Sequence, residues 1–143
     1  MTDFTAFDRY VDANREAFVG ELDAFCRRPC ISAQNSGTEE TAEYVRGLLG
    51  TIGAGPRLLE TASAPLVYGG VGTGSHTLLI YNHYDVQPPE PLELWHSSPF
   101  EPLIRDGKMY ARGVSDTRAD MLARIIAVRI WQRKAPIGPR CAA

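Results

Sequence analysis

Apolar side chains near the start of the chain recur at helical spacing. The stripe consists of Phe4, Phe7, Val11, Phe18, Leu22 and Phe25. Residues three, four or seven positions apart share one face of an α-helix, so this pattern predicts a single helix over residues 3–27. Pro29 ends the helix, because proline cannot continue the hydrogen-bond ladder.

A second helix is predicted after the loop that follows Pro29. Ser36 and Thr38 are both candidate N-caps, since each side chain can accept a bond from an unpaired backbone N–H. The apolar face of this helix is formed by Val45, Leu48, Leu49 and Ile52. Gly53 and Gly55 follow and end it.

The chain then becomes strand-like. Short apolar runs at residues 57–60 (RLLE), 65–71 (PLVYGGV) and 77–81 (TLLIY) are separated by turn residues, which predicts three strands. The last of them is apolar throughout and is typical of a buried strand.

The second half of the chain is predicted to hold a loop, a hairpin and a long helix. Residues 86–102 are too rich in proline for a regular helix or a central strand. Residues 104–113 predict a hairpin that turns at Asp106-Gly107. Residues 117–133 predict a helix that is apolar around much of its circumference, and such helices are buried. Alternating helices and strands predict a layered α/β architecture.

Length and composition narrow the class of protein. The 143 residues are enough for one domain with one core. With 44% hydrophobic residues, 22% charged residues and a net charge of −2, the chain has no electrostatic signature of nucleic-acid or membrane binding. The first residues lack the basic and apolar regions of a signal peptide, so we expect a cytoplasmic protein.

The chain has an odd number of cysteines, Cys26, Cys30 and Cys141. The expected compartment is reducing, so no disulfide is expected. Cys26 and Cys30 stand four positions apart, and no second Cys or His pair follows at zinc-finger spacing. Unconnected thiols are therefore the preferred interpretation.

His83 and Asp85 follow the predicted strand at residues 77–81. Side chains two positions apart on a strand point the same way, so both can face one pocket at the carboxyl end of the sheet. A carboxylate can hold the second ring nitrogen of a metal-bound histidine. It can equally hold a buried structural histidine, and these residues alone leave both interpretations open.

Asp116 lies immediately before the last predicted helix. One interpretation is an N-cap, a role that aspartate fills well. The other is an oxygen ligand that bridges two cations through its two carboxylate oxygens. Ser115 is a poor nucleophile candidate, because GVSDT lacks the second glycine of a nucleophile elbow.

Taken together, residues 78–121 closely resemble one family: the dinuclear-zinc peptidases and amidohydrolases that include cytosolic dipeptidases, carnosinases, aminoacylases and succinyl-diaminopimelate desuccinylases. The resemblance lies in the H-x-D at His83, the W-x-x-x-P-F from Trp95 to Phe100, and the G-K-x-Y-A-R-G-x-x-D from Gly107 to Asp116. The upstream RRPCISAQ and ETAEYVRGLLGTIG also resemble this family.

The resemblance implies a zinc-exopeptidase-like α/β domain with a mixed sheet flanked by helices. Residues 1–134 would be its amino-terminal part, followed by an irregular tail at residues 135–143. His83 then corresponds to a zinc ligand, Asp116 to the carboxylate that bridges two zinc ions, and Asp85 to the catalytic-site residue that orients the histidine. The peptide bond after Asp116 is expected to be cis. The implied reaction is hydrolysis of an amide in a small peptide or acyl-amino acid by zinc-activated water.

The chain also departs from the family pattern. In family members the general-base glutamate and further ligands follow the bridging aspartate, whereas here Asp120 is the only acidic residue after Asp116. We therefore expect a truncated fragment that is weakly active or inactive alone. Arg118-Ala119 replaces the family's Lys-Gly. The methyl group that Ala119 adds leaves open whether the backbone at Asp116 has the family's conformation.

A function of a different class stays open. The chain could be a non-catalytic binding module that self-associates through an unfinished sheet, because unpaired strand edges and exposed apolar surface favour association.

Overall fold

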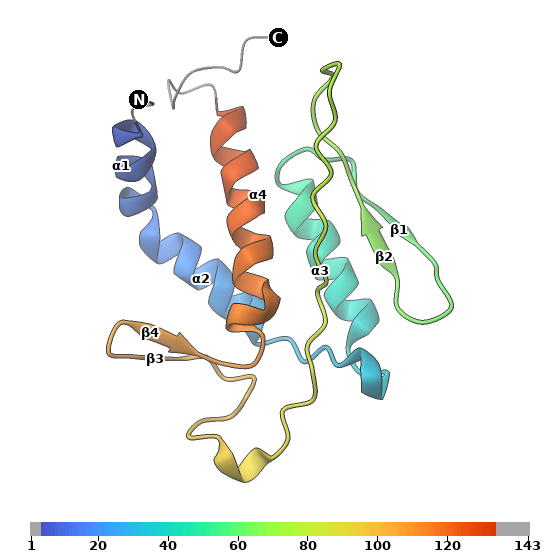
Figure 1. Ribbon diagram of the computed structural model, residues 1–143, viewed down its shortest axis with the longest axis vertical. Helices are drawn as coiled ribbons and strands as arrows, with labels where there is room; N and C mark the ends of the chain where they lie inside the picture. Colours follow the sequence, from blue (N-terminus) through green and yellow to red (C-terminus); the bar gives the residue numbers. More distant parts are fainter. Residues whose placement is uncertain (1–3, 134–143) are drawn as a thin grey trace.

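The computed structural model describes residues 4–133, which form helices and two small hairpins (Figure 1). The helices are α1 (Thr5–Ala13), α2 (Arg15–Cys26), α3 (Thr38–Gly50) and α4 (Ala119–Gln132), and the strands are β1 (Arg57–Leu59), β2 (Leu66–Tyr68), β3 (Leu103–Arg105) and β4 (Lys108–Tyr110). The tail predicted at residues 135–143, including Cys141, lies outside the described residues.

The single helix predicted over residues 3–27 is wrong, because the chain bends at Asn14 and forms α1 and α2. Asn14 has non-helical torsions (φ −113°, ψ 10°), and its side-chain amide donates a hydrogen bond to the carbonyl of Tyr10 at 2.8 Å. Asparagine competes well for backbone groups in this way, which explains a break that the apolar periodicity does not reveal.

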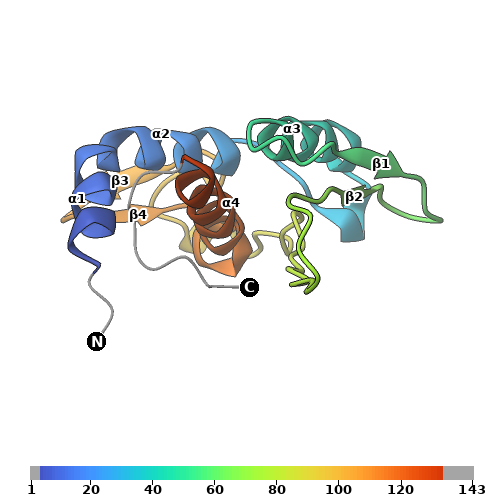
Figure 2. The same cartoon turned by 90° about the horizontal axis from the view of Figure 1, so that it is seen from above.

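Helix α4 occupies the centre of the core and packs on both sides, as its apolar sequence predicts. On one side its side chains meet the stripe of α1 and α2, in a cluster of Phe7, Tyr10, Val11, Phe18, Leu22, Leu122, Ile126 and Ile130. On the other side they meet the end of α2 and the face of α3, in a cluster that includes Phe25, Val45, Leu48, Ile52, Met121 and Ile125. Figure 2 shows α2 and α3 in one layer, with α4 beneath it.

Helix α3 begins at a glycine rather than at either predicted cap. Gly37 is the N-cap residue, with left-handed torsions (φ 67°, ψ 16°), and no side chain caps this helix. A Cβ atom at Gly37 would stand 1.9 Å from the carbonyl oxygen of Pro29. The predicted caps at Ser36 and Thr38 are therefore wrong, because the close approach of two backbone segments requires glycine here.

The structure contains the hairpin predicted at residues 104–113 and another hairpin, formed by two of the predicted strands. β1 and β2 pair in antiparallel fashion, as do β3 and β4. The second hairpin turns at Asp106 and Gly107, which both have positive φ (52° and 71°), as expected for an Asp-Gly turn. The α/β class is confirmed, but the strands of residues 4–133 form two separate antiparallel pairs rather than one mixed sheet.

The buried strand predicted at residues 77–81 is wrong. This segment runs as extended chain past α3 (Figure 1), outside both hairpins. Leu78, Leu79 and Tyr81 are 83%, 82% and 80% exposed. In the described part of the chain no strand lies beside this segment, so its apolar side chains have no sheet face to pack against.

Residues 86–102 are irregular, as their prolines predict, apart from one short 3₁₀ helix, η2 (Leu92–Leu94). The indole of Trp95 holds this loop by donating to the carbonyl of Pro89 at 2.7 Å. Within residues 4–133, no helix is both long and apolar enough to cross a bilayer.

Gly37 and Gly47 form a matched pair for a stability test. We expect Gly37→Ala to lower the free energy of unfolding by more than about 2 kcal/mol, because it combines strain at positive φ with a backbone clash. Gly47 lies exposed in α3, and a Cβ atom added there would have nothing within 4 Å. Gly47→Ala should therefore raise the free energy of unfolding by about 0.5–1 kcal/mol. Urea denaturation measures both, and equal effects would contradict this account of the cap.

Candidate active site

The side chains of His83 and Asp85 lie against each other, as their spacing predicts. His83 Nδ1 is 3.1 Å from Asp85 Oδ1 and 3.1 Å from the Asp85 carbonyl oxygen. Both of these oxygens are hydrogen-bond acceptors, so Nδ1 carries the proton and donates. A neutral His83 ring then presents the lone pair of Nε2 on its other side.

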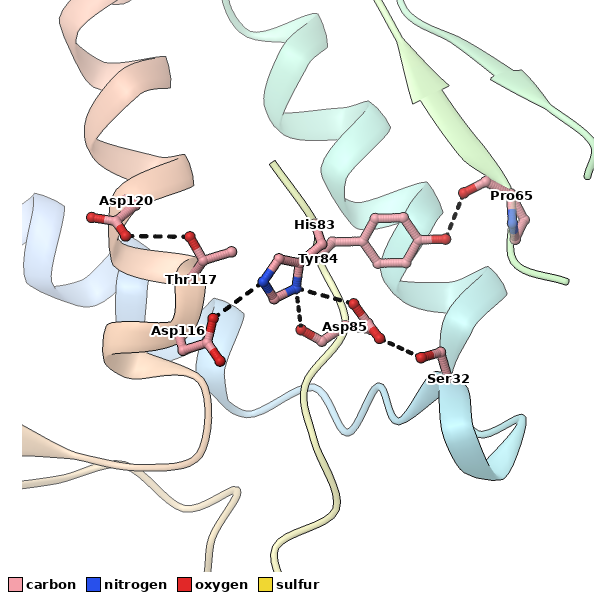
Figure 3. A network of polar contacts seen from close by, with 8 residues as sticks. All are labelled: Ser32, Pro65, His83, Tyr84, Asp85, Asp116, Thr117 and Asp120. Atoms are coloured by element: carbon pink, nitrogen blue, oxygen red, sulfur yellow. Dashed lines mark hydrogen bonds and ion pairs between the residues drawn. The ribbon is translucent and has the colours of Figure 1, made fainter. Parts of the chain in front are cut away.

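That second nitrogen faces Asp116. His83 Nε2 is 3.2 Å from Asp116 Oδ1, and Figure 3 shows the two side chains pointing toward one another. A lone pair and a carboxylate repel each other unless a proton or a cation lies between them. Two donors bound to one zinc ion at about 2.1 Å each, at a tetrahedral angle, stand about 3.4 Å apart. The observed separation therefore suits a metal ion.

The site is open to solvent. The side chain of Asp116 is 76% exposed and that of His83 is 43% exposed, whereas Asp85 is 27% exposed. A cation and a small substrate can therefore approach from the Asp116 side, while Asp85 supports the ring from behind.

Tyr84 points to the opposite side of the chain and anchors it. Its hydroxyl donates to the carbonyl of Pro65 at 2.6 Å, and its ring packs against the core cluster that contains Phe25 and Val45. Burial raises the pKa of Tyr84 to about 12. Because alternate residues of an extended chain face opposite ways, anchoring Tyr84 turns His83 and Asp85 toward the site (Figure 3).

Asp116 lies in a distorted turn, η3 (Val114–Arg118), in which Asp116 and Thr117 have non-helical torsions. The Asp116–Thr117 peptide bond is cis, which the family resemblance implied. Arg118, not Asp116, occupies the N-cap position of α4, and no side chain caps that helix. The N-cap interpretation of Asp116 is therefore wrong, and its carboxylate is turned toward His83 instead.

Arg118 fixes this turn to α2. Its side chain is fully buried, and its guanidinium donates to the carbonyls of Phe25 at 2.8 Å and Arg28 at 2.7 Å. It also lies 4.9 Å from the centre of the Phe25 ring. Burial lowers the pKa of Arg118, and the nearby thiol of Cys26 partly opposes this shift.

The sequence pattern presents Arg118 only as a charge that replaces lysine, and it does not reveal this role. A planar guanidinium can bond two carbonyls at once, whereas a lysine ammonium is a point donor. Ala119 has ordinary helical torsions (φ −63°, ψ −41°), so its methyl group does not disturb the turn.

Gly113 makes room for this arrangement. It has φ 85°, and a Cβ there would lie 2.6 Å from Val86 Cγ1 and 3.2 Å from Arg118 Cδ. The glycine before η3 thus allows the chain to pass close to both Val86 and the Arg118 side chain.

Ser32 is a further residue at this site that the sequence did not predict. It lies in the short turn η1 (Ser32–Gln34), and its hydroxyl donates to Asp85 Oδ2. No sequence pattern pointed to it, because 53 positions separate the two residues.

Within residues 4–133, no group of three or more His, Cys, Asp or Glu side chains is placed to hold a metal ion. His83 and Asp116 fit as two donors of the right chemistry, with Asp85 on the second ring nitrogen. Cys26 and Cys30 are free thiols, as predicted. Both are also buried, and burial raises the pKa of both thiols.

Known proteins share both sequence and structure with this chain. Residues 79–139 match the family described as "Peptidase family M20/M25/M40". Succinyl-diaminopimelate desuccinylase from Thiobacillus denitrificans is 44% identical over 68 residues, covering 48% of this chain and 17% of that protein. The same enzyme from Xylella fastidiosa is 32% identical over 100 residues, covering 70% of this chain and 26% of that protein.

Two solved structures share the fold. An M20 family metallo-carboxypeptidase, Sso-CP2 from Sulfolobus solfataricus, matches with a TM-score of 0.79 and 37% identity, over 82% of this chain and 27% of that one. Human carnosine dipeptidase 1 matches with a TM-score of 0.76 and 24% identity, over 91% of this chain and 32% of that one. The chain thus spans less than a third of the length of these proteins.

The role of Arg118 can be tested by its removal. Arg118→Ala removes one hydrogen bond from each of the Phe25 and Arg28 carbonyls and opens a cavity, so we expect the free energy of unfolding to fall by about 3 kcal/mol. Arg46 is the matched control, because it is an exposed arginine paired with Glu43 at 2.6 Å. Arg46→Ala should cost less than about 1 kcal/mol. Equal midpoints for the two variants in urea denaturation would contradict the role assigned to Arg118.

Proposed function

We propose that this chain, whose residues 79–139 match the M20/M25/M40 peptidase family, supplies part of the site of a zinc-dependent hydrolase. The proposed reaction is cleavage of an amide bond by metal-activated water. The observation that carries the proposal is the approach of His83 Nε2 to Asp116 Oδ1 at 3.2 Å. These are two electron-pair donors, and Asp85 already holds the other nitrogen of the His83 ring.

Each residue has a proposed role that follows from its contacts. His83 and Asp116 would hold the metal, and Asp85 keeps the proton on His83 Nδ1 and fixes the plane of the ring. In the described chain the Asp116 carboxylate is bonded through Oδ1 alone, which leaves Oδ2 for a second cation, as a bridging role requires. Zinc bound here would lower the pKa of its water and polarise the substrate carbonyl.

The names of the similar proteins support a substrate class. They include a desuccinylase, a carboxypeptidase and a dipeptidase. We therefore propose a small peptide or an acyl-amino acid as substrate. The free thiols of Cys26 and Cys30 are in keeping with a reducing compartment such as the cytoplasm.

The chain alone is proposed to bind zinc weakly. A closed zinc site takes about four ligands, and His83 and Asp116 supply two. Water would complete the coordination, so the affinity should be low. Hydrolysis should be negligible, because the reaction needs a carboxylate that acts as general base, which family members carry after the bridging aspartate. The only acidic residue after Asp116 in this chain is Asp120, whose carboxylate instead accepts from the Thr117 hydroxyl at 3.3 Å.

Zinc titration by calorimetry tests this proposal. We expect weak binding that His83→Gln and Asp116→Asn each abolish, because each removes one of two donors. His76→Gln is the control, since His76 is exposed and contacts Ser75 at 3.2 Å, outside the site. Zinc affinity that survives both site variants would contradict the site. Strong, chelator-sensitive dipeptidase activity would contradict the predicted inactivity of this chain.

A second candidate function is self-association. The observation that favours it is the exposed segment at residues 77–81, where Leu78 and Leu79 are more than 80% exposed. Residues 71–82 contain no Asp, Glu, Lys or Arg. Edge strands normally carry charges that prevent pairing, so this segment is open to pairing with a second copy of the chain.

Light scattering coupled to size exclusion tests self-association. The wild-type chain is expected to run as a dimer or larger species, and Leu79→Lys is expected to shift it to monomer by placing a charge in the pairing segment. Leu94→Lys serves as the control, because Leu94 is 72% exposed but lies in η2, away from this segment. A wild-type chain that is monomeric at every protein concentration measured would rule out this function.

A further inference from the structure

The Asp85 carboxylate divides its two oxygens between two partners. Oδ1 lies 3.1 Å from His83 Nδ1, and Oδ2 accepts the hydroxyl hydrogen of Ser32. A continuous series of polar contacts therefore runs from Ser32 through Asp85 and His83 to Asp116 (Figure 3).

The turn that carries Ser32 is held at both ends. The Ile31 N–H donates to the Ser36 carbonyl at 2.8 Å, and the Ser36 N–H donates back at 3.2 Å. Ile31 is 6% exposed, so its side chain anchors the turn in the core. The Ser32 hydroxyl thus projects from a closed loop.

A second backbone contact sets the distance between this loop and Asp85. The Val86 N–H donates to the Cys30 carbonyl at 2.8 Å, one residue beyond Asp85 and two residues before Ser32. Cys30 is fully buried and Val86 is 3% exposed. The two segments are therefore registered against each other where the Ser32–Asp85 bond forms.

The two bonds to Asp85 restrict rotation of its carboxylate. The torsion about the Cβ–Cγ bond of aspartate is broad, so a carboxylate bonded through one oxygen can turn about that bond. Bonds to both oxygens fix its plane. We propose that Ser32 is a positioning residue that acts through Asp85 to orient the imidazole of His83 toward Asp116. This role rests on the proposed metal-binding function of that pair.

A simpler explanation is that the bond only pins the loop. The two explanations differ in what they predict for the His83 ring. A purely structural bond leaves the ring tautomer unchanged when it is removed, provided that the loop stays folded. A positioning bond, in contrast, affects how firmly Asp85 holds the Nδ1 proton.

Nitrogen-15 NMR of the His83 ring in the metal-free chain distinguishes them, with His83→Gln used to assign the signals. The spectra are recorded at one fixed alkaline pH, at which the Nδ1-protonated tautomer should dominate in the wild type. Ser32→Ala should raise the share of the other tautomer at least twofold, and Ser32→Thr should restore the wild-type ratio. Ser36→Ala, in the same loop but joined to it through backbone bonds, should leave the ratio unchanged.

A double-mutant comparison shows whether Ser32 acts through Asp85. In an Asp85→Ala background, Ser32→Ala should cause no further change in the tautomer ratio. A change that persists in that background, an unchanged ratio in Ser32→Ala, or an equal response to Ser36→Ala would overturn the proposal.

Zinc titration of the same variants separates this proposal from the proposed function. Ser32→Ala should weaken zinc binding about tenfold, as loss of a group that orients a metal ligand does. A wild-type chain that binds no zinc would defeat the metal site, while the tautomer experiment would still decide the role of Ser32.

Discussion

The buried guanidinium of Arg118 is the interaction on which the rest of the structure depends. Burying a charge is unfavourable unless hydrogen bonds compensate for the lost water. Here the Phe25 and Arg28 carbonyls accept those bonds at 2.8 and 2.7 Å. Phe25 lies in the last turn of α2 and Arg28 just beyond it, where the backbone carbonyls carry partial negative charge. One side chain thus satisfies the end of α2 and fixes the turn that presents Asp116.

The site is assembled from three segments that are far apart in sequence. Ser32 comes from the loop after α2, His83 and Asp85 come from extended chain, and Asp116 comes from the turn before α4. Arg118 places the last of these, and the Val86–Cys30 backbone bond registers the first two. The geometry of His83 and Asp116 is therefore a product of tertiary structure, and the side chains themselves remain open to solvent on the Asp116 side.

Local signals predicted much of the fold. The Asp-Gly turn predicted the second hairpin, the apolar circumference of residues 117–133 predicted a buried helix, and the H-x-D spacing predicted the contact between His83 and Asp85. The errors came where another interaction competes with the local pattern. Asn14 bonds the Tyr10 carbonyl and breaks a periodic helix. The apolar run at residues 77–81 predicts a buried strand, but strand burial also requires a neighbouring strand, which periodicity cannot supply.

In the candidate site, too, local motifs identified some residues and missed those that act through distant contacts. His83, Asp85 and Asp116 could be named from sequence because their motifs are short and contiguous. Ser32 and Arg118 could not, since each acts through contacts more than 50 positions away. Gly37 was missed for a related reason, because its requirement for glycine arises from the approach of Pro29 rather than from its own neighbours.

The central claim is that His83 and Asp116 together receive a divalent metal ion. Anomalous X-ray scattering at the zinc edge, from crystals of the chain grown with zinc, tests it most directly. The account predicts an anomalous peak within bonding distance of both His83 Nε2 and Asp116 Oδ1, about 2.1 Å from each. A peak elsewhere on the chain, with the His83–Asp116 contact unchanged and no density between the two side chains, would contradict it.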